Sequence, residues 1–240
     1  GIPALEATLT RGCWTPVERF AVGAEAAGVE GIHARARLLA PDGQHFVIET
    51  ADGAVCTVNW SLRGTHNVAN ALAAFLTART LGVAPEVYAE ACASFRGVRR
   101  RLESLGQVGD IEVLDDFAHH PTAIAATLAG LKAAVTRGGR VHAVLELRSN
   151  SMRAGEYQEQ LAAALDDADG VWVLTPPELG WDVPASLAPL GTRAHCLPTD
   201  EALVAAVSAA AGPGDRVVCM SNGDFAGVPG RILAALAARA

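Results

Sequence analysis

The second half of the sequence repeats one order of elements: an apolar run, then a polar loop, then a helical stretch. The predicted strands are residues 111–114, 141–147, 171–174, 194–197 and 217–220. The predicted helices are residues 121–135, 156–165, 200–210 and 229–238. Strands that alternate with helices build a parallel sheet with helices on both faces. We therefore expect an α/β fold in this half, with a doubly wound, Rossmann-like and mainly parallel sheet.

The first half has a different pattern, typical of a β-meander followed by helices. The predicted strands are residues 35–40, 46–50 and 55–60, and turns separate them at 41–43 and 51–53. Apolar spacing then predicts a helix over 67–81, with Asn67 as its N-cap, and a second helix over 85–95 that begins with proline.

Gly106 and Gly109 lie between the two patterns and predict a linker or tight turn. We place a domain boundary there, which gives domains 1–105 and 106–240. A chain of 240 residues is long enough for two modest domains, because single domains usually contain about 100–200 residues.

Charge and cysteine content exclude several classes of function. The 19 Lys and Arg residues against 26 Asp and Glu leave a formal net charge of −7, the wrong sign for a protein that grips nucleic acid by neutralising phosphates. No apolar stretch reaches the ~18 residues of a membrane helix, and the first residues do not resemble a signal peptide. We therefore expect a cytoplasmic protein without membrane contact.

The 5 cysteines form no C-x-x-C pair, so we expect reduced core thiols rather than disulfides or a zinc site.

Polar side chains follow the predicted strands, at the edge where open parallel sheets bind ligands. The loops that carry them are residues 115–120, 148–153, 175–181 and 221–227. Asp115 and Asp116 have a plain alternative role, which is to favour the positive end of the helix that follows them. Arg148 with Asn150 has another, which is to cap the next helix.

Three further groups of residues are also open to two interpretations. Asn67 and Asn70 share one face of a helix start, where amides either cap the helix or hydrogen-bond a ligand. The arginines at 99–101 are either a solvated surface run or a phosphate clamp. His119 and His120 lack a third ligand at a usual spacing, so no metal site is predicted within this chain.

Three segments carry a recognisable pattern. Residues 64–74 read G-T-H-N-V-A-N-A-L-A-A, residues 98–103 read V-R-R-R-L-E, and residues 115–122 read D-D-F-A-H-H-P-T. In order and spacing they resemble signatures of the Mur ligase family, the ATP-dependent amide ligases of peptidoglycan synthesis. Within the family, the third segment, followed by R-S-N-S-M and M-S-N-G-D-F, is most similar to the ligases that join UDP-N-acetylmuramate to the recycled murein tripeptide L-Ala-γ-D-Glu-meso-diaminopimelate. The resemblance spans essentially the whole chain.

One family motif is missing. Members carry a P-loop, G-x-x-G-K-[ST], in their central domain, whereas this sequence has no Gly-Lys pair and its only lysine, Lys132, lies within a predicted helix. The resemblance therefore implies that residues 1–105 are the tail of a central ATP-binding domain and that residues 106–240 are the family's C-terminal domain. The P-loop, most magnesium ligands and a UDP-binding domain would lie upstream. We expect this chain alone to be inactive as a ligase.

The resemblance also implies how the nucleotide would be held. ATP would phosphorylate the carboxylate of UDP-N-acetylmuramate, and the tripeptide amine would then attack, which requires positioning and charge stabilisation. By match to the family's motifs, Asn67 and Asn70 would contact the nucleotide and Arg101 its phosphates. Asp116 would contact the ribose, with Asp115 as the alternative.

The other substrates would meet different residues. His119 or His120 would lie near the reacting carboxylate and amine. The tripeptide has carboxylates that need arginine and amide donors, for which the candidates are Arg148, Asn150, Ser221 and Asn222.

Two rival interpretations stay open. UDP-N-acetylmuramate:L-alanine ligases share the D-D-x-x-H-H-P-T type of segment, although the R-S-N-S-M loop suits a peptide better than free alanine. A non-catalytic nucleotide- or peptide-binding module is favoured by the missing P-loop. A P-loop encoded upstream would favour the enzyme over the non-catalytic binding module.

Overall fold

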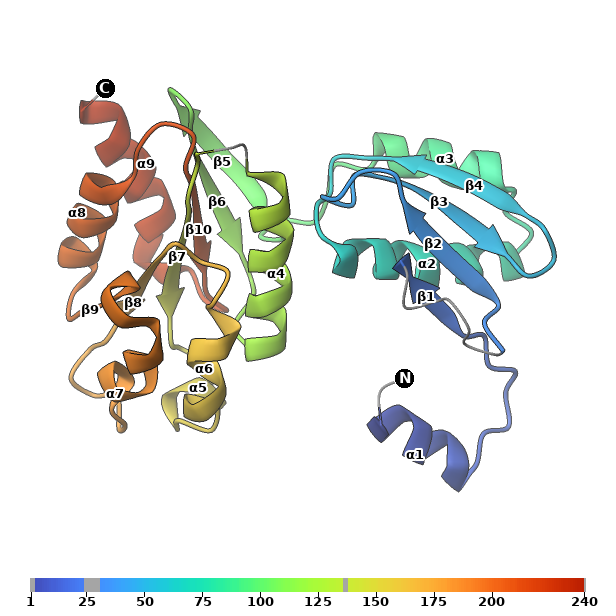
Figure 1. The fold of residues 1–240 in the computed structure, drawn as a ribbon, viewed down its shortest axis with the longest axis horizontal. Coiled ribbons are helices and arrows are strands. Elements are labelled where there is room, and N and C mark those ends of the chain that lie inside the picture. Colours follow the sequence, from blue (N-terminus) through green and yellow to red (C-terminus); the bar gives the residue numbers. More distant parts are fainter. Residues whose placement is uncertain (1–2, 24–30, 136–137, 240) are drawn as a thin grey trace.

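The computed structural model describes residues 3–23, 31–135 and 138–239. In these ranges the strands form a four-stranded sheet of order β1-β2-β3-β4 and a six-stranded sheet of order β5-β6-β10-β7-β8-β9 (Figure 1). Each sheet is packed against its own helices. The chain therefore contains two structural halves that meet near residue 100.

The first half is a small sheet covered by helices. Its strands are β1 (Phe20–Val22), β2 (Ala34–Leu38), β3 (His45–Thr50) and β4 (Val55–Asn59). Its helices are α1 (Pro3–Arg11), α2 (Thr65–Thr80) and α3 (Pro85–Ser94). β2, β3 and β4 pair antiparallel, which confirms the predicted meander, and β1 adds a parallel strand that the sequence pattern did not predict. Helices α2 and α3 pack on the sheet, whereas α1 has no buried residue and lies apart from it (Figure 1).

The second half is the α/β unit that the alternating pattern predicts. Its strands are β5 (Glu103–Val108), β6 (Ile111–Asp116), β7 (Val141–Glu146), β8 (Gly170–Leu174), β9 (Ala194–Leu197) and β10 (Arg216–Met220). Its helices are α4 (Pro121–Ala134), α5 (Asn150–Arg153), α6 (Gln158–Ala164), α7 (Val183–Leu187), η2 (Ala188–Arg193), α8 (Asp200–Ala210), η3 (Phe225–Gly227) and α9 (Val228–Arg239). β5 is antiparallel to β6, and the other pairs in this sheet are parallel.

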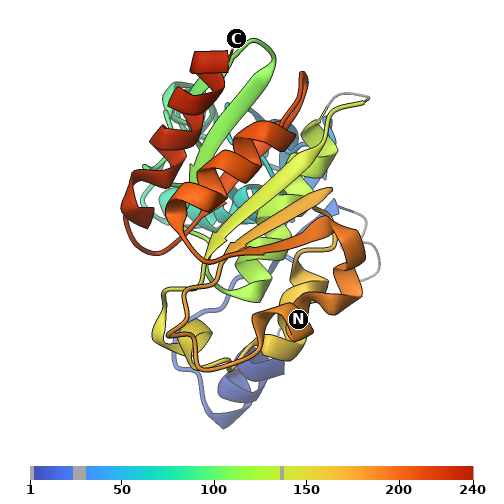
Figure 2. The same ribbon diagram turned by 90° about the vertical axis from the view of Figure 1, so that its left-hand side faces the viewer.

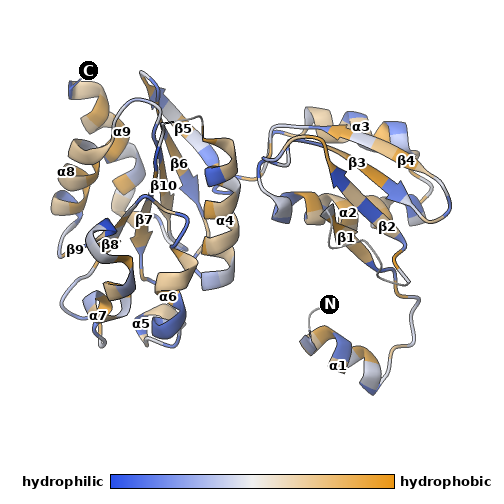
Figure 3. Ribbon diagram, viewed as in Figure 1, coloured by the Kyte–Doolittle hydropathy of each residue, from blue (hydrophilic) through white to orange (hydrophobic). Residues whose placement is uncertain are grey.

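The six-stranded sheet has an apolar core on each face. Along β7, Ala143 and Leu145 belong to the cluster under α4 and α6, while Val144 belongs to the cluster under α8 and α9. Figure 2 shows α8 and α9 in front of the strands, and Figure 3 shows the central strands coloured as hydrophobic. A strand buried on both faces is apolar along most of its length, which is why β7 was recognisable from the sequence. The doubly wound, mainly parallel fold is confirmed.

Some local predictions are wrong. Gly106 lies inside strand β5 at a break in its pairing with β6, and only Gly109 lies in the turn between the two strands. The helix predicted over 156–165 is shorter and is preceded by the separate helix α5, because Gly155 takes a φ of 75° between them.

The burial of the cysteines and the length of the helices can be compared with the predictions. Cys56, Cys92 and Cys219 are buried, Cys196 is partly exposed, and Cys13 is exposed, so the prediction of a core thiol is wrong for Cys13. Within the described ranges, every helix is too short or too polar to cross a bilayer.

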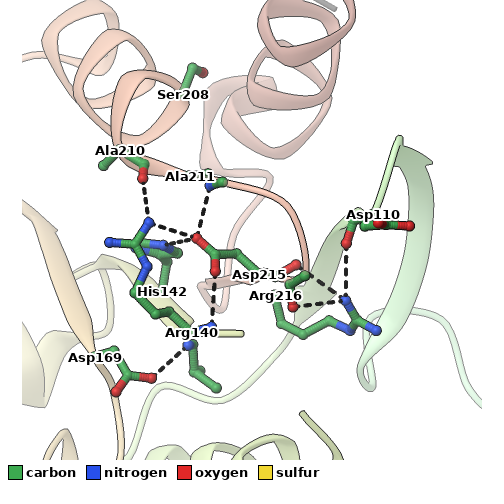
Figure 4. Close-up of polar contacts among 12 residues, drawn as sticks. Asp110, Arg140, His142, Asp169, Ser208, Ala210, Ala211, Asp215 and Arg216 are labelled. Atoms are coloured by element: carbon green, nitrogen blue, oxygen red, sulfur yellow. Dashed lines mark hydrogen bonds and ion pairs between the residues drawn. The ribbon is translucent and has the colours of Figure 1, made fainter. Parts of the chain in front are cut away.

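A buried polar cluster ties the amino ends of β7 and β10 together (Figure 4). Asp215 is 2% exposed, and its Oδ2 accepts hydrogen bonds from Gly212 N (2.8 Å), Arg140 Nη2 (2.9 Å) and His142 Nε2 (2.9 Å). His142 Nδ1 accepts from Trp172 Nε1 at 3.3 Å. The neutral imidazole with its proton on Nε2 therefore satisfies both ring nitrogens. This cluster lies at the end of the sheet opposite to the predicted ligand-binding loops, and its role is structural.

Acid is expected to destabilise the chain through His142. Burial lowers the pKa of this imidazole below its ordinary value of 6.5, although the hydrogen bond and charge of Asp215 oppose the shift; Arg140 adds to it and Asp169 opposes it. Because the unfolded chain protonates this histidine at a higher pH than the folded chain, its contribution to stability is complete above about pH 6.5 and is lost as pH falls toward the folded pKa.

Urea unfolding at several pH values tests this. His142→Asn is expected to reduce the slope of unfolding free energy against pH below neutrality, by at most roughly 1.4 kcal/mol per pH unit. His45→Asn, on β3, is the matched control for the loss of one histidine. Equal slopes for wild type and His142→Asn would contradict the assignment.

Candidate functional site

Residues that are far apart in the sequence line one cavity of about 780 Å³ between the two halves. Its walls come from α2, α3, the segment 95–102, the end of β6 and the first turns of α4. The predicted site residues that line it are Asn67, Asn70, Arg101, Asp116 and His120. Much of the remaining wall is apolar and includes Trp60, Tyr88 and Phe95. An apolar wall with a few convergent polar groups is the usual lining of a small-molecule site.

Asn67 and Asn70 lie next to each other in the first turns of α2. The N-cap is Gly64, at a φ of 91°, so the prediction of Asn67 as N-cap is wrong. A Cβ at Gly64 would lie 2.6 Å from the His66 ring, which is why glycine is needed there. Asn67 Nδ2 donates to Arg63 O at 2.7 Å, and Asn70 Nδ2 donates to Asn67 Oδ1 at 3.4 Å. The two amides thus stand side by side on the cavity wall and neither caps the helix.

The three consecutive arginines have different surroundings. Arg100 Nε lies 3.1 Å from Asp115 Oδ2, and its Nη2 donates to Ser221 O at 2.7 Å. Its backbone is left-handed, with a φ of 57°, which is uncommon outside glycine. Arg99 and Arg101 are both exposed, but only Arg101 lines the cavity, where its guanidinium lies 5.4 Å from the centre of the Phe117 ring. Arg100 therefore fastens the linker to the second sheet, while Arg101 faces the cavity.

Asp116 ends β6 and is 4% exposed. Its Oδ2 accepts from Leu102 N at 2.7 Å, and its Oδ1 accepts from Ala118 N at 2.8 Å and from Thr127 Oγ1 at 3.4 Å. Burial raises the pKa of Asp116 against the effect of the two backbone bonds, and burial likewise raises the pKa of Asp115. Asp116 therefore anchors the backbone on both sides of the cavity edge that it lines.

The two histidines after β6 have separate roles. His120 is the N-cap of α4: its Nδ1 accepts from Thr122 N at 3.3 Å, and its ring meets Tyr157 edge-on at 4.6 Å. The N-cap of this helix is therefore His120 and neither of the preceding aspartates. His119 Nδ1 donates to Phe117 O at 2.8 Å, and His119 does not line the cavity. Of the two, His120 is placed for contact with a ligand through Nε2.

His66 also lines the cavity, although the sequence patterns had assigned it no role. Its Nδ1 is buried and has no hydrogen-bond partner within the described part of the chain. Burial lowers the pKa of this imidazole; the charge of Asp116 opposes that shift and Arg101 adds to it. The available signal was its position in the H-N segment at 66–67.

The residues predicted to bind the tripeptide lie apart from this cavity. Arg148 lines a smaller hollow of about 250 Å³ at the carboxyl ends of β7 and β8. We call it the β7–β8 groove; its lining is Glu146, Leu147, Arg148, Arg153, Leu174, Pro176, Glu178 and Leu179. Arg148 Nη1 pairs with Asp224 Oδ1 at 3.0 Å. A Cβ at Gly223 would lie 1.9 Å from Arg148 Nη1, so glycine at 223 makes room for the arginine.

Asn150 begins helix α5 and is exposed. The N-cap is Ser149, whose Oγ accepts from Met152 N at 3.4 Å. The alternative in which Arg148 and Asn150 cap this helix is therefore wrong.

Ser221 and Asn222 follow β10 next to the groove. Ser221 Oγ accepts from Gly223 N at 2.9 Å and donates to the Glu146 carboxylate. The Asn222 Oδ1 atom is buried and finds no hydrogen-bond partner in the described ranges. A buried acceptor without a donor is costly, and a ligand N–H would satisfy it.

The two halves touch at a pair of glycines beside the cavity. A Cβ at Gly130 in α4 would lie 2.9 Å from Gly64 Cα and 3.3 Å from Gly64 N. Those are backbone atoms, so Gly130→Ala must push α4 away from the start of α2. Overpacking costs about 1–3 kcal/mol, which exceeds the gain in helix propensity of about 0.5–1 kcal/mol.

Gly130→Ala is therefore expected to reduce the free energy of unfolding of the chain by about 1 kcal/mol, as measured by urea unfolding. Ala129→Ser, on the exposed side of the same helix, is the control and should change the free energy of unfolding by less than about 0.5 kcal/mol. An unchanged free energy of unfolding in Gly130→Ala would show that this contact is not closely packed.

The side chains fit a nucleotide better than a metal ion. Among the described residues, no three His, Cys, Asp or Glu side chains are grouped as a metal would need. Lys132 lies in α4 and pairs with Asp169 Oδ1 at 2.6 Å, away from the cavity lining. The cavity instead offers two amides, one guanidinium and an apolar wall, which complement a heterocyclic base and a phosphate chain.

The sequence is similar to that of known proteins along most of its length. The family profile described as "Mur ligase, glutamate ligase domain" matches residues 100–223. The chain is 40% identical over 236 residues to the UDP-N-acetylmuramate–L-alanyl-γ-D-glutamyl-meso-2,6-diaminoheptandioate ligase of Escherichia coli (strain K12), covering 98% of this chain and 50% of that protein. It is 37% identical over 187 residues to the UDP-N-acetylmuramate–L-alanine ligase of Mycobacterium sp. (strain JLS), covering 75% of this chain and 39% of that protein.

The fold is also similar to that of a solved structure from the same group of proteins. The crystal structure of a murein peptide ligase from Psychrobacter arcticus 273-4 matches with a TM-score of 0.69 and 36% sequence identity, over 98% of this chain and 49% of that one. The chain therefore spans about half the length of the curated relatives that it matches.

Proposed function

The chain belongs to the Mur ligase family, and on that basis we propose that it is the carboxy-terminal half of an ATP-dependent amide ligase that joins UDP-N-acetylmuramate to L-Ala-γ-D-Glu-meso-diaminopimelate. The observation that carries the proposal is the cavity between the two halves. It gathers Asn67, Asn70, Arg101, Asp116 and His120, which match three separate motifs of the family. Residues up to about 100 would then be the tail of the central domain, and the residues that follow, which include the whole of β5, would be the C-terminal domain.

The first half would hold the nucleotide. Asn67 and Asn70 present adjacent amides on the cavity wall, and Arg101 brings a guanidinium that fits phosphate oxygens. ATP, when bound, supplies the phosphoryl group that activates the carboxylate. The P-loop and the magnesium ligands of the family are expected outside this chain.

Asp116 would act mainly as a positioning residue. Because its carboxylate oxygens accept from Leu102 N and Ala118 N, it fixes the segment that presents Arg101 and the loop that leads to His120. A ribose hydroxyl would donate a hydrogen bond to one of these same carboxylate oxygens, in addition to the backbone donors. Asp115 is less suited to the ribose, since it pairs with Arg100.

His120 would lie beside the reacting groups. The bond from Thr122 N makes Nδ1 an acceptor, so the neutral ring carries its proton on Nε2. That N–H can donate a hydrogen bond to a carboxylate oxygen of the substrate.

The share of this chain that matches each relative supports the tripeptide, rather than free alanine, as the third substrate. The Escherichia coli relative, named for the tripeptide, matches 98% of the chain, whereas the mycobacterial L-alanine ligase matches 75%. Arg148, Asn150, Ser221 and Asn222 would serve the peptide from the loops after β7 and β10. This is the same edge of the sheet as the end of β6, because the three strands run parallel.

The proposal is tested by an assay of ADP release and amide formation with ATP, UDP-N-acetylmuramate and the tripeptide. The full-length protein is expected to turn over, and this chain alone is expected to show no ligase activity, since it has no P-loop lysine. A full-length protein that binds the substrates without forming the amide would favour a binding module instead.

A further inference from the structure

A second pocket lies next to the cavity, at the segment 95–102 that joins the two halves. Its volume is about 490 Å³, which is within the usual range for small-molecule sites. We call it the linker pocket; its charged lining residues are Arg63, Arg96, Arg99, Arg101, Glu103 and Glu112. Arg101 also lines the cavity, whereas the other three arginines do not. The proposed function assigns no ligand to the linker pocket.

Both carboxylates of the linker pocket are already engaged by donors. Glu112 Oε2 lies 2.9 Å from Arg216 Nε and 3.5 Å from Arg63 Nη1. Glu103 Oε2 accepts a hydrogen bond from Arg100 N at 2.8 Å. Since these donors offset the negative charge of the glutamates, the carboxylates oppose an incoming anion only weakly.

The guanidiniums of Arg96 and Arg99 are free for a ligand. In the part of the chain that the structure describes, neither forms an ion pair with a carboxylate, and both residues are exposed. Ser61 and Ser104 add hydroxyl groups to the same lining. Arginine binds phosphate oxygens with charge-assisted, often bidentate hydrogen bonds. In a chain with a formal net charge of −7, four arginines around one pocket therefore indicate a site for an anion.

The uncharged part of the lining favours a phosphate that is carried by an organic group. Leu62, Val98, Leu102 and Leu114 give the linker pocket apolar surface. An inorganic phosphate ion would leave this surface in contact with water, whereas an organic group would cover it.

We propose that the linker pocket is an anion site that binds the phosphate group of a small molecule. Arg96 and Arg99 hold the phosphate oxygens from the linker, and Arg63 approaches from the first half. Because Arg63 also contacts Glu112 on β6, the bound phosphate lies where the linker and both halves meet. Arg99 is thus a phosphate ligand at a site other than the cavity.

Calorimetric titration of the full-length protein tests this assignment. Phenyl phosphate is added in the presence of magnesium and a saturating non-hydrolysable ATP analogue, which occupies the cavity and Arg101. Wild type is expected to bind phenyl phosphate with a Kd of about 1 mM or tighter, since about two charge-assisted bonds supply that affinity. Arg96→Gln and Arg99→Gln are each expected to weaken the binding by about 10-fold.

The matched control is Arg35→Gln, which removes an exposed guanidinium on β2, outside the linker pocket, and should keep the wild-type Kd at constant ionic strength. Titration with inorganic phosphate separates the two sources of the group. Tighter binding of phenyl phosphate assigns the pocket to an organic phosphate, and tighter binding of the free ion assigns it to inorganic phosphate. No binding of either probe, an unchanged Kd in both pocket variants, or an equal loss in Arg35→Gln would overturn the proposal.

Discussion

Arg101→Ala in the full-length enzyme is expected to lower kcat/KM for ATP by about 100-fold or more. The reason is that Arg101 lines the cavity. A guanidinium that meets transferring phosphate charge stabilises the transition state more than the ground state. Steady-state kinetics with ATP varied at saturating UDP-N-acetylmuramate and tripeptide measures the effect.

The neighbouring arginines provide the controls. Arg99→Ala is expected to change kcat/KM little, because Arg99 does not line the cavity. Arg100→Ala is expected to act through stability, since it removes the ion pair with Asp115 and the bond to Ser221 O. Equal kinetic losses in all three variants, with equal stability, would identify the arginines as a general basic surface.

Asp116→Asn is expected to reduce the free energy of unfolding of this chain by about 2–4 kcal/mol. The carboxylate accepts from Leu102 N and from Ala118 N with different oxygens. An asparagine has one oxygen, so its NH₂ group would face one of the two backbone donors and leave that N–H unsatisfied. Leu102 also has a left-handed backbone, with a φ of 51°, which depends on such anchoring.

Urea unfolding followed by far-UV circular dichroism gives this number without any ligase assay. Asp110→Asn, in the exposed turn between β5 and β6, is the control and should stay within about 0.5 kcal/mol of wild type. If Asp116→Asn were as stable as the control, Asp116 would not be the anchor described above.

Sequence patterns predicted the strands that are buried on both faces but missed those that depend on a neighbour. β7 and β10 consist mostly of apolar residues, which is a signal contained in each segment itself. β1 has three residues and exists through its pairing with β2. β5 contains Gly106 and was read as a linker, because its strand character comes from pairing with β6. Pairing across the chain is not encoded in a local pattern.

The motifs predicted which residues to inspect, and the fold determined what each one touches. Arg99, Arg100 and Arg101 are the same residue type in the sequence, yet only Arg100 is tied to Asp115 and only Arg101 lines the cavity. The contact between Gly64 and Gly130 joins residues 66 positions apart, and no spacing rule indicates it. The roles in substrate binding that the motifs imply stay predictions.

The choice of the third substrate by the full-length enzyme tests the central claim most directly. The measurement is kcat/KM for L-Ala-γ-D-Glu-meso-diaminopimelate against kcat/KM for free L-alanine, with ATP and UDP-N-acetylmuramate saturating. The account predicts a preference for the tripeptide of at least about 10-fold, the value of one charge-assisted bond to its distal end. A preference for free L-alanine would contradict it and would identify the chain as part of an L-alanine ligase.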